Sequence, residues 1–290
     1  MHMPPSYVGR GGTLIALGRV ASVPTVWSHC LAGWWLGGAG HPGELLALWF
    51  GATCLYFGGT FLNDACDAEY DAIFRRQRPI ASGEIELRTI WLLSLAWLGT
   101  GLLTLMLFGK STAVLALLLA TTIVLYDALH KIMVLSPLLL AVARFLLYLV
   151  GASAAAEGIT GLAVWSGLAL ASYATGLHYF AQNKKPTEVP LAWPIVPLAV
   201  PLLLAWLVNG EGYRWVCCVL SLLVLSWFFL CLRYAFGATA RNIVHTGNGL
   251  VAGMVLLDFL AVAPETLWLS AFFAPLFLAT LALQRLQPAH

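Results

Sequence analysis

The stretch NDACDAEYDAIFRRQRPIASG, which begins at Asn63, combines an amide, three regularly spaced aspartates and three arginines. On a helix, which turns about 100° per residue, Asn63, Asp67 and Asp71 share one stripe with Asp64, whereas Glu69 points away. Stacked carboxylates repel one another unless a cation lies between them. Mg²⁺ prefers such oxygen ligands and usually completes its shell with phosphate oxygens. The stripe therefore predicts magnesium bound by Asn63, Asp64, Asp67 and Asp71.

Three arginines follow the acidic stripe. Pro79 cannot continue a helix, so the helix is expected to end near RRQRP. Arg75, Arg76 and Arg78 would then lie close to an anion held by the metal. Anchoring at a membrane surface is the alternative explanation for these arginines.

The rest of the chain is strongly apolar. Its 290 residues are 60% hydrophobic and include 12 Trp and 14 Phe, with a mean hydropathy of +0.85. A helix crosses the bilayer core with roughly 20 apolar residues. We therefore expect an all-α fold in a single domain over residues 1–290, a polytopic membrane bundle of nine to ten transmembrane helices. The expected spans are residues 13–37, 44–63, 88–108, 111–127, 135–156, 161–182, 190–209, 213–236, 243–263 and 267–286.

Other features of the composition limit the possible partners. The start MHMPPSYVGRGG lacks the pattern of a cleaved signal peptide, so the first span is expected to direct insertion. The six cysteines lack metal-ligand spacing and are interpreted as small buried side chains. A net charge of +2 indicates no nucleic-acid partner.

The positive charges predict the orientation, because Lys and Arg favour the cytoplasmic side of membrane proteins. With ten spans, only Lys110 and Arg214 fall outside, and Arg144 falls within a span. We therefore expect a multi-pass protein of the plasma (inner) membrane, with its N-terminus and the acidic stripe in the cytoplasm. The twelve cytoplasmic charges are Arg10, Arg19, Arg75, Arg76, Arg78, Arg88, Lys131, Lys184, Lys185, Arg233, Arg241 and Arg285.

Three stretches resemble the UbiA superfamily of intramembrane prenyltransferases. The acidic stretch resembles its first aspartate-rich motif, Asn-Asp-x-x-Asp-x-x-x-Asp followed by Arg-Pro and a small-residue-Gly turn. LGRVASVPTVWSHCLAGWWLGG resembles the first span of the family, and YDALHKIMVLSPLLLAVARFLLYLVGAS resembles the end of the fourth span through the fifth. Motif-level resemblance covers about residues 14–155.

The resemblance implies a helical bundle around a cavity that is open to lipid. There an isoprenyl diphosphate would lose its diphosphate with the help of Mg²⁺, and an aromatic or lipid acceptor would take the isoprenyl group. It implies catalytic roles for Asp67 and Asp71, and it favours Arg78 for the diphosphate because of the Arg-Pro context. Membrane lipids would surround the bundle.

Further candidates lie outside the acidic stripe. Tyr126, Asp127 and Lys131 resemble the Tyr…Lys signature of the family, which implies substrate binding by the first two and a catalytic role for Lys131. Arg19 is expected to contact substrate or to snorkel to the interface. Arg144 is expected to act in catalysis, or else to pair with a carboxylate such as Asp127, since an unpaired charge in a span is expensive.

Two other polar residues in the spans receive no functional role. His29 is interpreted as a lone packing residue, and Asp258 is expected to lie far from the mouth of the cavity.

One departure from the family concerns its second aspartate-rich motif. Here the end of the sixth span reads HYFAQNKKPTEV, with no aspartate. Asn183, Lys184 and Lys185 are expected to bind substrate instead, since a lysine can replace a metal's charge near phosphate.

Because this motif is missing, a non-catalytic binder or carrier of isoprenoid lipid stays open as the alternative function. The aspartate pattern of CDP-alcohol phosphotransferases is absent, and only Arg144 resembles the midplane charges of a transporter.

The first test concerns topology. A cysteine at Ser82 (Ser82→Cys), in a background without reactive cysteines, should resist membrane-impermeant labelling in intact cells, because the charge pattern places residues 64–87 inside. Lys110→Cys, on the opposite side, serves as the labelled control. Labelling of residue 82 with protection of residue 110 would invert the predicted topology.

Overall fold

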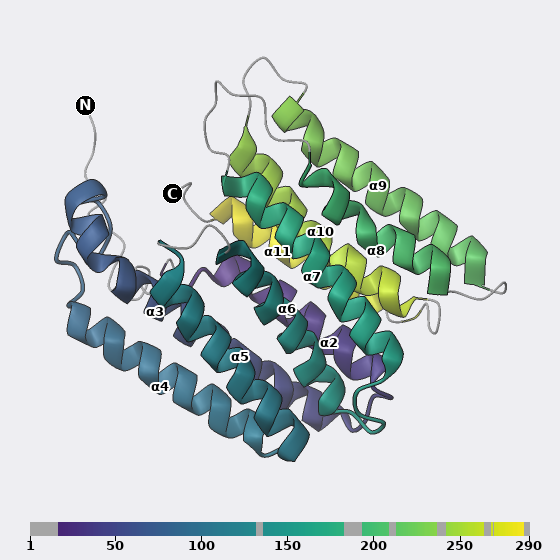
Figure 1. Cartoon of the computed structure of the whole chain (residues 1–290), viewed down its shortest axis with the longest axis horizontal. Coiled ribbons are helices and arrows are strands. Elements are labelled where there is room, and N and C mark those ends of the chain that lie inside the picture. Colours follow the sequence, from purple (N-terminus) through teal and green to yellow (C-terminus); the bar gives the residue numbers. More distant parts are fainter. Residues whose placement is uncertain are drawn as a thin grey trace.

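The chain forms a bundle of antiparallel helices in a computed structural model, which describes residues 17–131, 136–182, 193–208, 213–236, 242–263, 268 and 270–286 (Figure 1). A 3₁₀ turn, η1, precedes ten α-helices in these ranges. They are η1 (Val20–Ser22), α2 (Val23–Leu36), α3 (Pro42–Phe74), α4 (Leu87–Met106), α5 (Lys110–Leu129), α6 (Ser136–Ser153), α7 (Gly161–Gln182), α8 (Ile195–Val208), α9 (Arg214–Phe236), α10 (Ile243–Val262) and α11 (Ser270–Leu286).

The all-α expectation is confirmed, and each expected span overlaps one of these helices, although α3 continues to Phe74, well beyond the expected end at residue 63. Six of them, α3, α4, α5, α6, α9 and α10, are long and apolar enough to cross a membrane. The outermost helices expose large apolar side chains, such as Leu95 and Leu103 on α4 and Phe229 on α9. In water such surfaces would be costly, whereas lipid solvates them. The protein is therefore a multi-pass membrane protein.

The first span differs from its expected bounds of 13–37. The α-helix begins at Val23, after the η1 turn, and Arg19 adopts a left-handed conformation with φ 46°. Pro24 lies in the first turn of α2, where its missing N–H costs no hydrogen bond. The residues before 17 lie outside the described ranges.

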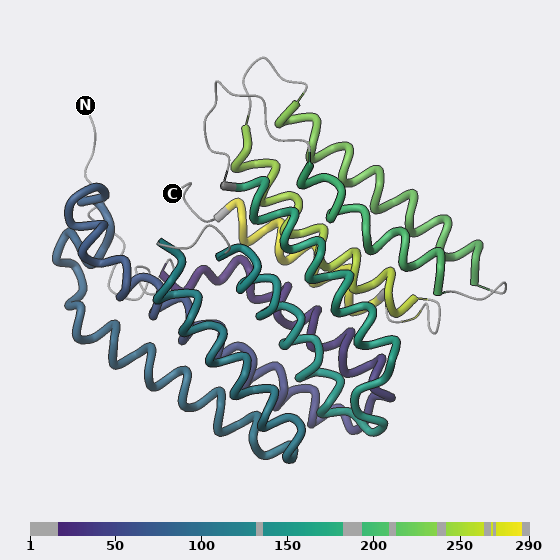
Figure 2. Tube along the Cα trace, in the orientation of Figure 1, coloured from purple at the N-terminus to yellow at the C-terminus, as the bar shows by residue number. Residues whose placement is uncertain are grey.

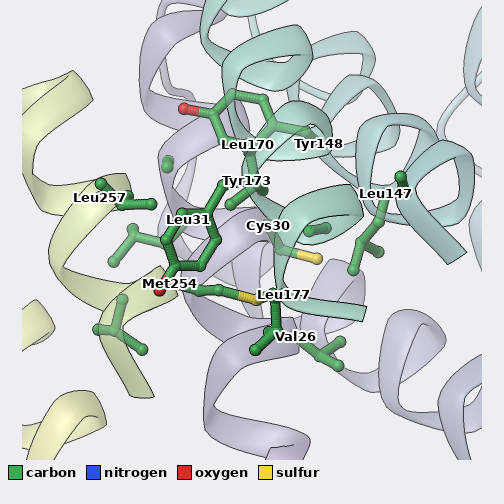
Figure 3. Close-up of a cluster of buried hydrophobic side chains, with 14 of the residues drawn as sticks. Val26, Cys30, Leu31, Leu147, Tyr148, Leu170, Tyr173, Leu177, Met254 and Leu257 are labelled. Atoms are coloured by element: carbon green, nitrogen blue, oxygen red, sulfur yellow. The ribbon is translucent and has the colours of Figure 1, made fainter. Parts of the chain in front are cut away.

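Helix α2 lies at the centre of the bundle. Twelve of its fourteen residues are buried, and it packs against α3, α6, α7, α10 and α11. Helices α4 and α9 lie at opposite edges of the view, with α2 and α6 between them (Figure 1). Figure 3 shows side chains from α2, α6, α7 and α10 packed together, including Val26, Tyr148, Tyr173 and Met254.

Successive helices alternate in direction along the trace (Figure 2). The start of α2 therefore lies at the same end of the bundle as the ends of α3, α5 and α7 and the start of α10. We call this the acidic end, because it carries Asp64, Asp67 and Asp71. The opposite end carries the C-terminal residues of α2, α6, α8 and α10.

Close contact between α2 and α6 requires glycine. A Cβ atom on Gly151 would lie 2.7 Å from the carbonyl oxygen of Cys30, and a Cβ on Gly33 would collide with the carbonyl oxygen of Tyr148. Backbone atoms cannot move aside as a flexible side chain can. Small residues of this kind let membrane helices approach closely.

This packing generates a stability prediction. Gly151→Ala should destabilise the bundle by about 1–3 kcal/mol, because the added methyl group overlaps the backbone of α2. The matched control is Gly99→Ala on α4, where a Cβ meets nothing within 4 Å; it should be neutral or stabilising by about 0.5–1 kcal/mol. Thermal unfolding in detergent compares the two. Equal unfolding temperatures for both variants would contradict the close contact.

Candidate active site

The acidic end collects the predicted site residues from three parts of the chain: the segment before η1, the last turns of α3 and the end of α5. Asn63, Asp64 and Asp71 are each less than a tenth exposed, whereas Glu69 is exposed. The stripe predicted from helical spacing therefore faces the bundle. Helix α3 ends at Phe74 and is capped at Arg75, as the arginines and Pro79 predict.

Asn63 connects these three parts. Arg19 Nη2 donates a hydrogen bond to Asn63 Oδ1 at 2.7 Å, and Asn63 Nδ2 donates to Asp127 Oδ1 at 3.1 Å. A carbonyl oxygen suits the guanidinium and an amide N–H suits the carboxylate, so the two partners fix the orientation of the amide. The hydroxyl of Tyr56 donates to the carbonyl of Arg19 at 3.0 Å, which helps to hold the arginine.

Asp64 lies between two arginines from different segments. Its Oδ1 is 3.4 Å from Arg19 Nη2 and 3.7 Å from Arg78 Nη1. Arg78 belongs to the turns between α3 and α4, so the Arg-Pro dipeptide is brought to the site as expected. One turn from the end of α3, Asp71 Oδ1 is 3.7 Å from Arg75 Nη1.

Asp67 lies against two side chains at the end of α5, a lysine and a histidine. Lys131 Nζ is 2.8 Å from Asp67 Oδ1 and donates to the carbonyl of Cys66 at 3.0 Å. His130 Nε2 lies 3.2 Å from the same carboxylate oxygen. The predicted Lys131 therefore reaches the acidic stripe.

Sequence reasoning missed His130 and Tyr70. The ring of His130 stacks on Tyr126 at 5.3 Å, and the i, i+4 spacing of these two residues was the signal that could have identified it. Tyr70 lies beneath two cations, with Arg75 at 5.7 Å and Lys131 at 5.6 Å from its ring centre. Such cation–π contacts help to position charges at the mouth of the site.

Exposure differs between the two signs of charge. The side chains of Arg19, Arg75, Arg78 and Lys131 are 22–46% exposed, whereas those of Asp64, Asp67 and Asp71 are only 5–17% exposed. The carboxylates thus line the interior and the cations form the rim. A rim cation can turn toward an incoming anion without crossing the protein interior.

The acidic end offers carboxylate oxygens to a magnesium ion. Among the described residues, no three His, Cys, Asp or Glu side chains gather closely enough to hold a metal by themselves. Asp64 Oδ2 and Asp127 Oδ2 are nevertheless buried without a hydrogen-bond partner. These oxygens fit a Mg²⁺ that protein carboxylates and substrate phosphates hold together, which is how Mg²⁺ is usually bound. The ligand set Asn63, Asp64, Asp67 and Asp71 stays a prediction.

Arg144 does not pair with Asp127 as the sequence suggested. Its Nη1 lies 3.1 Å from Thr25 Oγ1 and 3.0 Å from His29 Nε2. His29 Nδ1 in turn lies 2.6 Å from Asp258 Oδ2. His29 is thus buried and bonded at both ring nitrogens, and Asp258 lies toward the end of α10, away from the acidic end, as expected; the two meet Arg144 because α2, α6 and α10 pack together at the centre of the bundle. The catalytic role of Arg144 stays a prediction.

The remaining predicted residues, Asn183, Lys184 and Lys185, lie outside the described ranges, directly after the end of α7 at Gln182.

Comparisons with known proteins show similarity to membrane prenyltransferases. A segment of 85 residues is 34% identical to digeranylgeranylglyceryl phosphate synthase from Metallosphaera sedula, and it covers 29% of this chain and 30% of that protein. The match thus spans less than a third of the relative.

Solved structures show the fold. One described as digeranylgeranylglyceryl phosphate synthase in membranes matches with a TM-score of 0.56 at 18% identity, covering 87% of this chain and 98% of the other. A UbiA homologue from Archaeoglobus fulgidus bound to GPP and Mg²⁺ matches with a TM-score of 0.51 at 15% identity, covering 93% and 99%.

A family comparison covers most of the chain, including α2, the acidic stripe and the end of α5. Residues 21–242 match the UbiA prenyltransferase family. The expectation drawn from the motifs is confirmed: this chain belongs to the UbiA prenyltransferase family.

Proposed function

We propose that the protein transfers an isoprenyl group from an isoprenyl diphosphate to an aromatic or lipid acceptor within the membrane. Its 290 residues would act as one domain, with the acidic end in the cytoplasm below the plasma (inner) membrane. The observation that carries the proposal is the rim of cations around buried carboxylates at the acidic end. The A. fulgidus homologue, whose structure holds GPP and Mg²⁺, supports the same ligands here.

The rim and the carboxylates suit a diphosphate together with a divalent cation. Without ligand, Asp64, Asp67 and Asp71 are each neutralised by a rim cation. When bound by these carboxylates and the diphosphate, Mg²⁺ would supply positive charge to the leaving group. Arg78 and Lys131 are then free to exchange a carboxylate for phosphate oxygens, which are strong partners for both side chains. Substrate binding is thus an exchange of ionic partners.

The chemistry follows from where charge develops. The allylic C–O bond breaks and its electron pair leaves with the diphosphate, so negative charge grows on oxygens that Arg78 and Lys131 contact. The acceptor supplies the electron pair of the new bond to carbon and releases a proton. Arg19 and Asn63 position the diphosphate end, while Tyr126 and Asp127 flank it on α5.

The lysines beyond α7 would complete the charge balance. Lys184 and Lys185, with Asn183, occupy the place of the second aspartate-rich motif in the sequence. A lysine there would supply part of the charge that a second metal ion supplies elsewhere in the family. The missing aspartates also favour a second candidate function, a binder of isoprenoid lipid without turnover.

Metal dependence tests the acidic stripe. Asp67→Ala and Asp71→Ala should each weaken Mg²⁺-dependent binding of geranyl diphosphate by at least about tenfold, since each removes a carboxylate from the site. Binding is measured with and without Mg²⁺ in nanodiscs. Glu69→Ala, on the exposed face of the same helix, is the matched control and should bind normally. Unchanged affinity in both aspartate variants would refute the metal site.

Turnover separates an enzyme from a binder. Release of pyrophosphate from prenyl diphosphates, with a panel of phenolic and lipid acceptors, should be detectable and should fall in Lys184→Ala or Lys185→Ala more than binding does. The reason is that charge on the leaving group grows in the transition state. Normal binding without release for any acceptor would favour the binder. Release that both lysine variants leave intact would keep the enzyme and discard the role of the lysines.

A further inference from the structure

Arg144 carries hydrogen-bond donors that no described residue uses. Its Nη1 donates to Thr25 Oγ1 at 3.1 Å and to His29 Nε2 at 3.0 Å. Nε and Nη2 make no hydrogen bond within the described residues, and neither is among the fully buried polar atoms that lack a partner. Both nitrogens therefore retain accessible surface. Because arginine has only donors, this free edge of the side chain can bind only a hydrogen-bond acceptor.

The free edge of Arg144 faces the interior of the bundle. The exposed large side chains of α6 are Leu138 and Val142. Arg144 follows Val142 by two residues and so projects roughly 200° around the helix axis from it. It contacts α2 there, through the buried residues Thr25 and His29. An interior face is where a charged side chain in a span is expected, because lipid cannot solvate the charge.

Tyr56 links Arg144 to the acidic end. It lies on α3 before Asn63 on the same stripe, about two helical turns or roughly 10 Å farther from the acidic end. Its hydroxyl donates to the carbonyl of Arg19, and it interacts electrostatically with both Arg19 and Arg144. Arg19 is exposed, and Tyr56 and Arg144 are half-buried. These three side chains therefore form an accessible polar row that begins beside Asn63 and ends at Arg144.

No carboxylate of the described residues contacts Arg144, which takes part in none of their ion pairs. Asp258 lies beyond His29, with Oδ2 at 2.6 Å from His29 Nδ1. It is only 1% exposed and also accepts from Ser28. Asp258 is therefore held away from the free edge of Arg144. A cation in a span without a contacting anion is expensive, and such residues mark sites where a ligand binds.

The shape and charge of the free edge select a carboxylate. Nε and Nη2 direct two N–H bonds in parallel, and this fork matches the two oxygens of a planar carboxylate. A neutral carbonyl group would leave the charge of Arg144 without a contacting anion. A phosphate monoester carries up to two negative charges, which one arginine cannot neutralise deep in a membrane bundle. A carboxylate supplies one negative charge and two acceptor oxygens.

We propose that Nε and Nη2 of Arg144 bind a carboxylate of the acceptor, so that the acceptor is a carboxylate-bearing molecule. This inference rests on the proposed prenyl transfer and names the substrate class of the same site. Thr25 and His29 hold Nη1 and thereby fix the direction of the free edge, while Asp258 holds His29. The diphosphate at the acidic end and the carboxylate at Arg144 occupy opposite ends of the polar row. The isoprenyl group goes to another, electron-rich atom of the acceptor that lies between them.

Binding of a fluorescent hydroxynaphthoate tests the site without turnover. The protein, in phosphatidylcholine nanodiscs, is titrated with the acid or with its methyl ester, in the absence of prenyl diphosphate and Mg²⁺. Empty nanodiscs measure partition into lipid, which is subtracted. The acid should bind at least about tenfold more tightly, because the ester lacks the negative charge that the fork pairs with. Equal affinity for the two compounds, or no saturable binding of the acid, would overturn the proposal.

A variant places the carboxylate at Arg144. Arg144→Lys keeps the positive charge but loses the fork, so the acid should bind about tenfold more weakly while the ester is unaffected. Arg233→Lys, at an exposed arginine of α9, is the matched control and should bind both compounds as the wild type does. Thermal unfolding verifies that the variant is folded; if it is not, the comparison of acid and ester in the wild type decides. A preference for the acid that persists in folded Arg144→Lys would refute the assignment.

The rim cations at the acidic end are the other place where a carboxylate could bind. Inorganic pyrophosphate with Mg²⁺ should occupy the acidic end and leave binding of the hydroxynaphthoate intact, since the two ligands use opposite ends of the polar row. Competition between them would place the carboxylate at the rim and overturn the proposal.

Turnover separates this inference from the proposed function. With geranyl diphosphate and Mg²⁺, carboxylate-bearing acceptors should show kcat/KM values at least about tenfold above those of their methyl esters, and Arg144→Lys should remove the difference. A hydroxy fatty acid beside the hydroxynaphthoate distinguishes a lipid acid from an aromatic one. Esters that react as well as the acids would overturn the acceptor class. No pyrophosphate release with any acceptor would refute prenyl transfer, while the binding of acid and ester would still decide the site at Arg144.

Discussion

Buried charge within an apolar bundle is the constraint on which the rest of this structure depends. A carboxylate removed from water needs a cation or several donors, and in lipid no solvent supplies them. The bundle meets this need by pairing charges from helices that are distant in sequence. Asp67 on α3 is paired with Lys131 after α5, and Asp64 with Arg19 before η1. Each pair also connects two elements, so the charges help to determine how the helices sit.

The ion pairs at the acidic end remain accessible on their cation side, so they can bind an anion, which a fully buried ion pair cannot do. The aspartates face inward, whereas the cations at the rim remain accessible. The Oδ2 atoms of Asp64 and Asp127 lack hydrogen bonds, although their Oδ1 atoms accept them. Such an arrangement is stable without ligand and still has positive charge to offer to an anion. When a rim cation moves to a bound anion, the carboxylate that it leaves needs another cation. A metal ion bound with the diphosphate would be that cation.

The network around Asp258 solves the same problem differently. His29 and Asp258 are buried among α2, α6 and α10, and the half-buried Arg144 bonds to His29. His29 bridges Arg144 and Asp258. Close approach of α2 and α6 at Gly33 and Gly151 brings these side chains within reach of one another. The polar network and the small residues that allow this approach are therefore parts of one arrangement.

The sequence alone determined the class of fold, the ten helical segments and the acidic stripe. Hydropathy over spans of this length leaves few alternatives in a membrane, and the periodicity of a helix places Asn63, Asp64, Asp67 and Asp71 on one face whatever surrounds them. The resemblance to the UbiA family also assigned Arg78 and Lys131 to the site. These signals depend only on residues that are neighbours in the sequence, so they can be identified without knowing how the helices pack.

Only the tertiary structure decided which charges meet. The partner of Arg144 was expected on α5 but lies on α2, with the carboxylate beyond it on α10, more than a hundred residues away in the sequence. The contact of His130 with Asp67 and the break at Arg19 also came from the tertiary structure, because each depends on how one helix end meets another. A pattern along one helix reports which face is buried. It does not report what lies opposite, since that is decided by the packing of helices whose apolar surfaces are nearly alike.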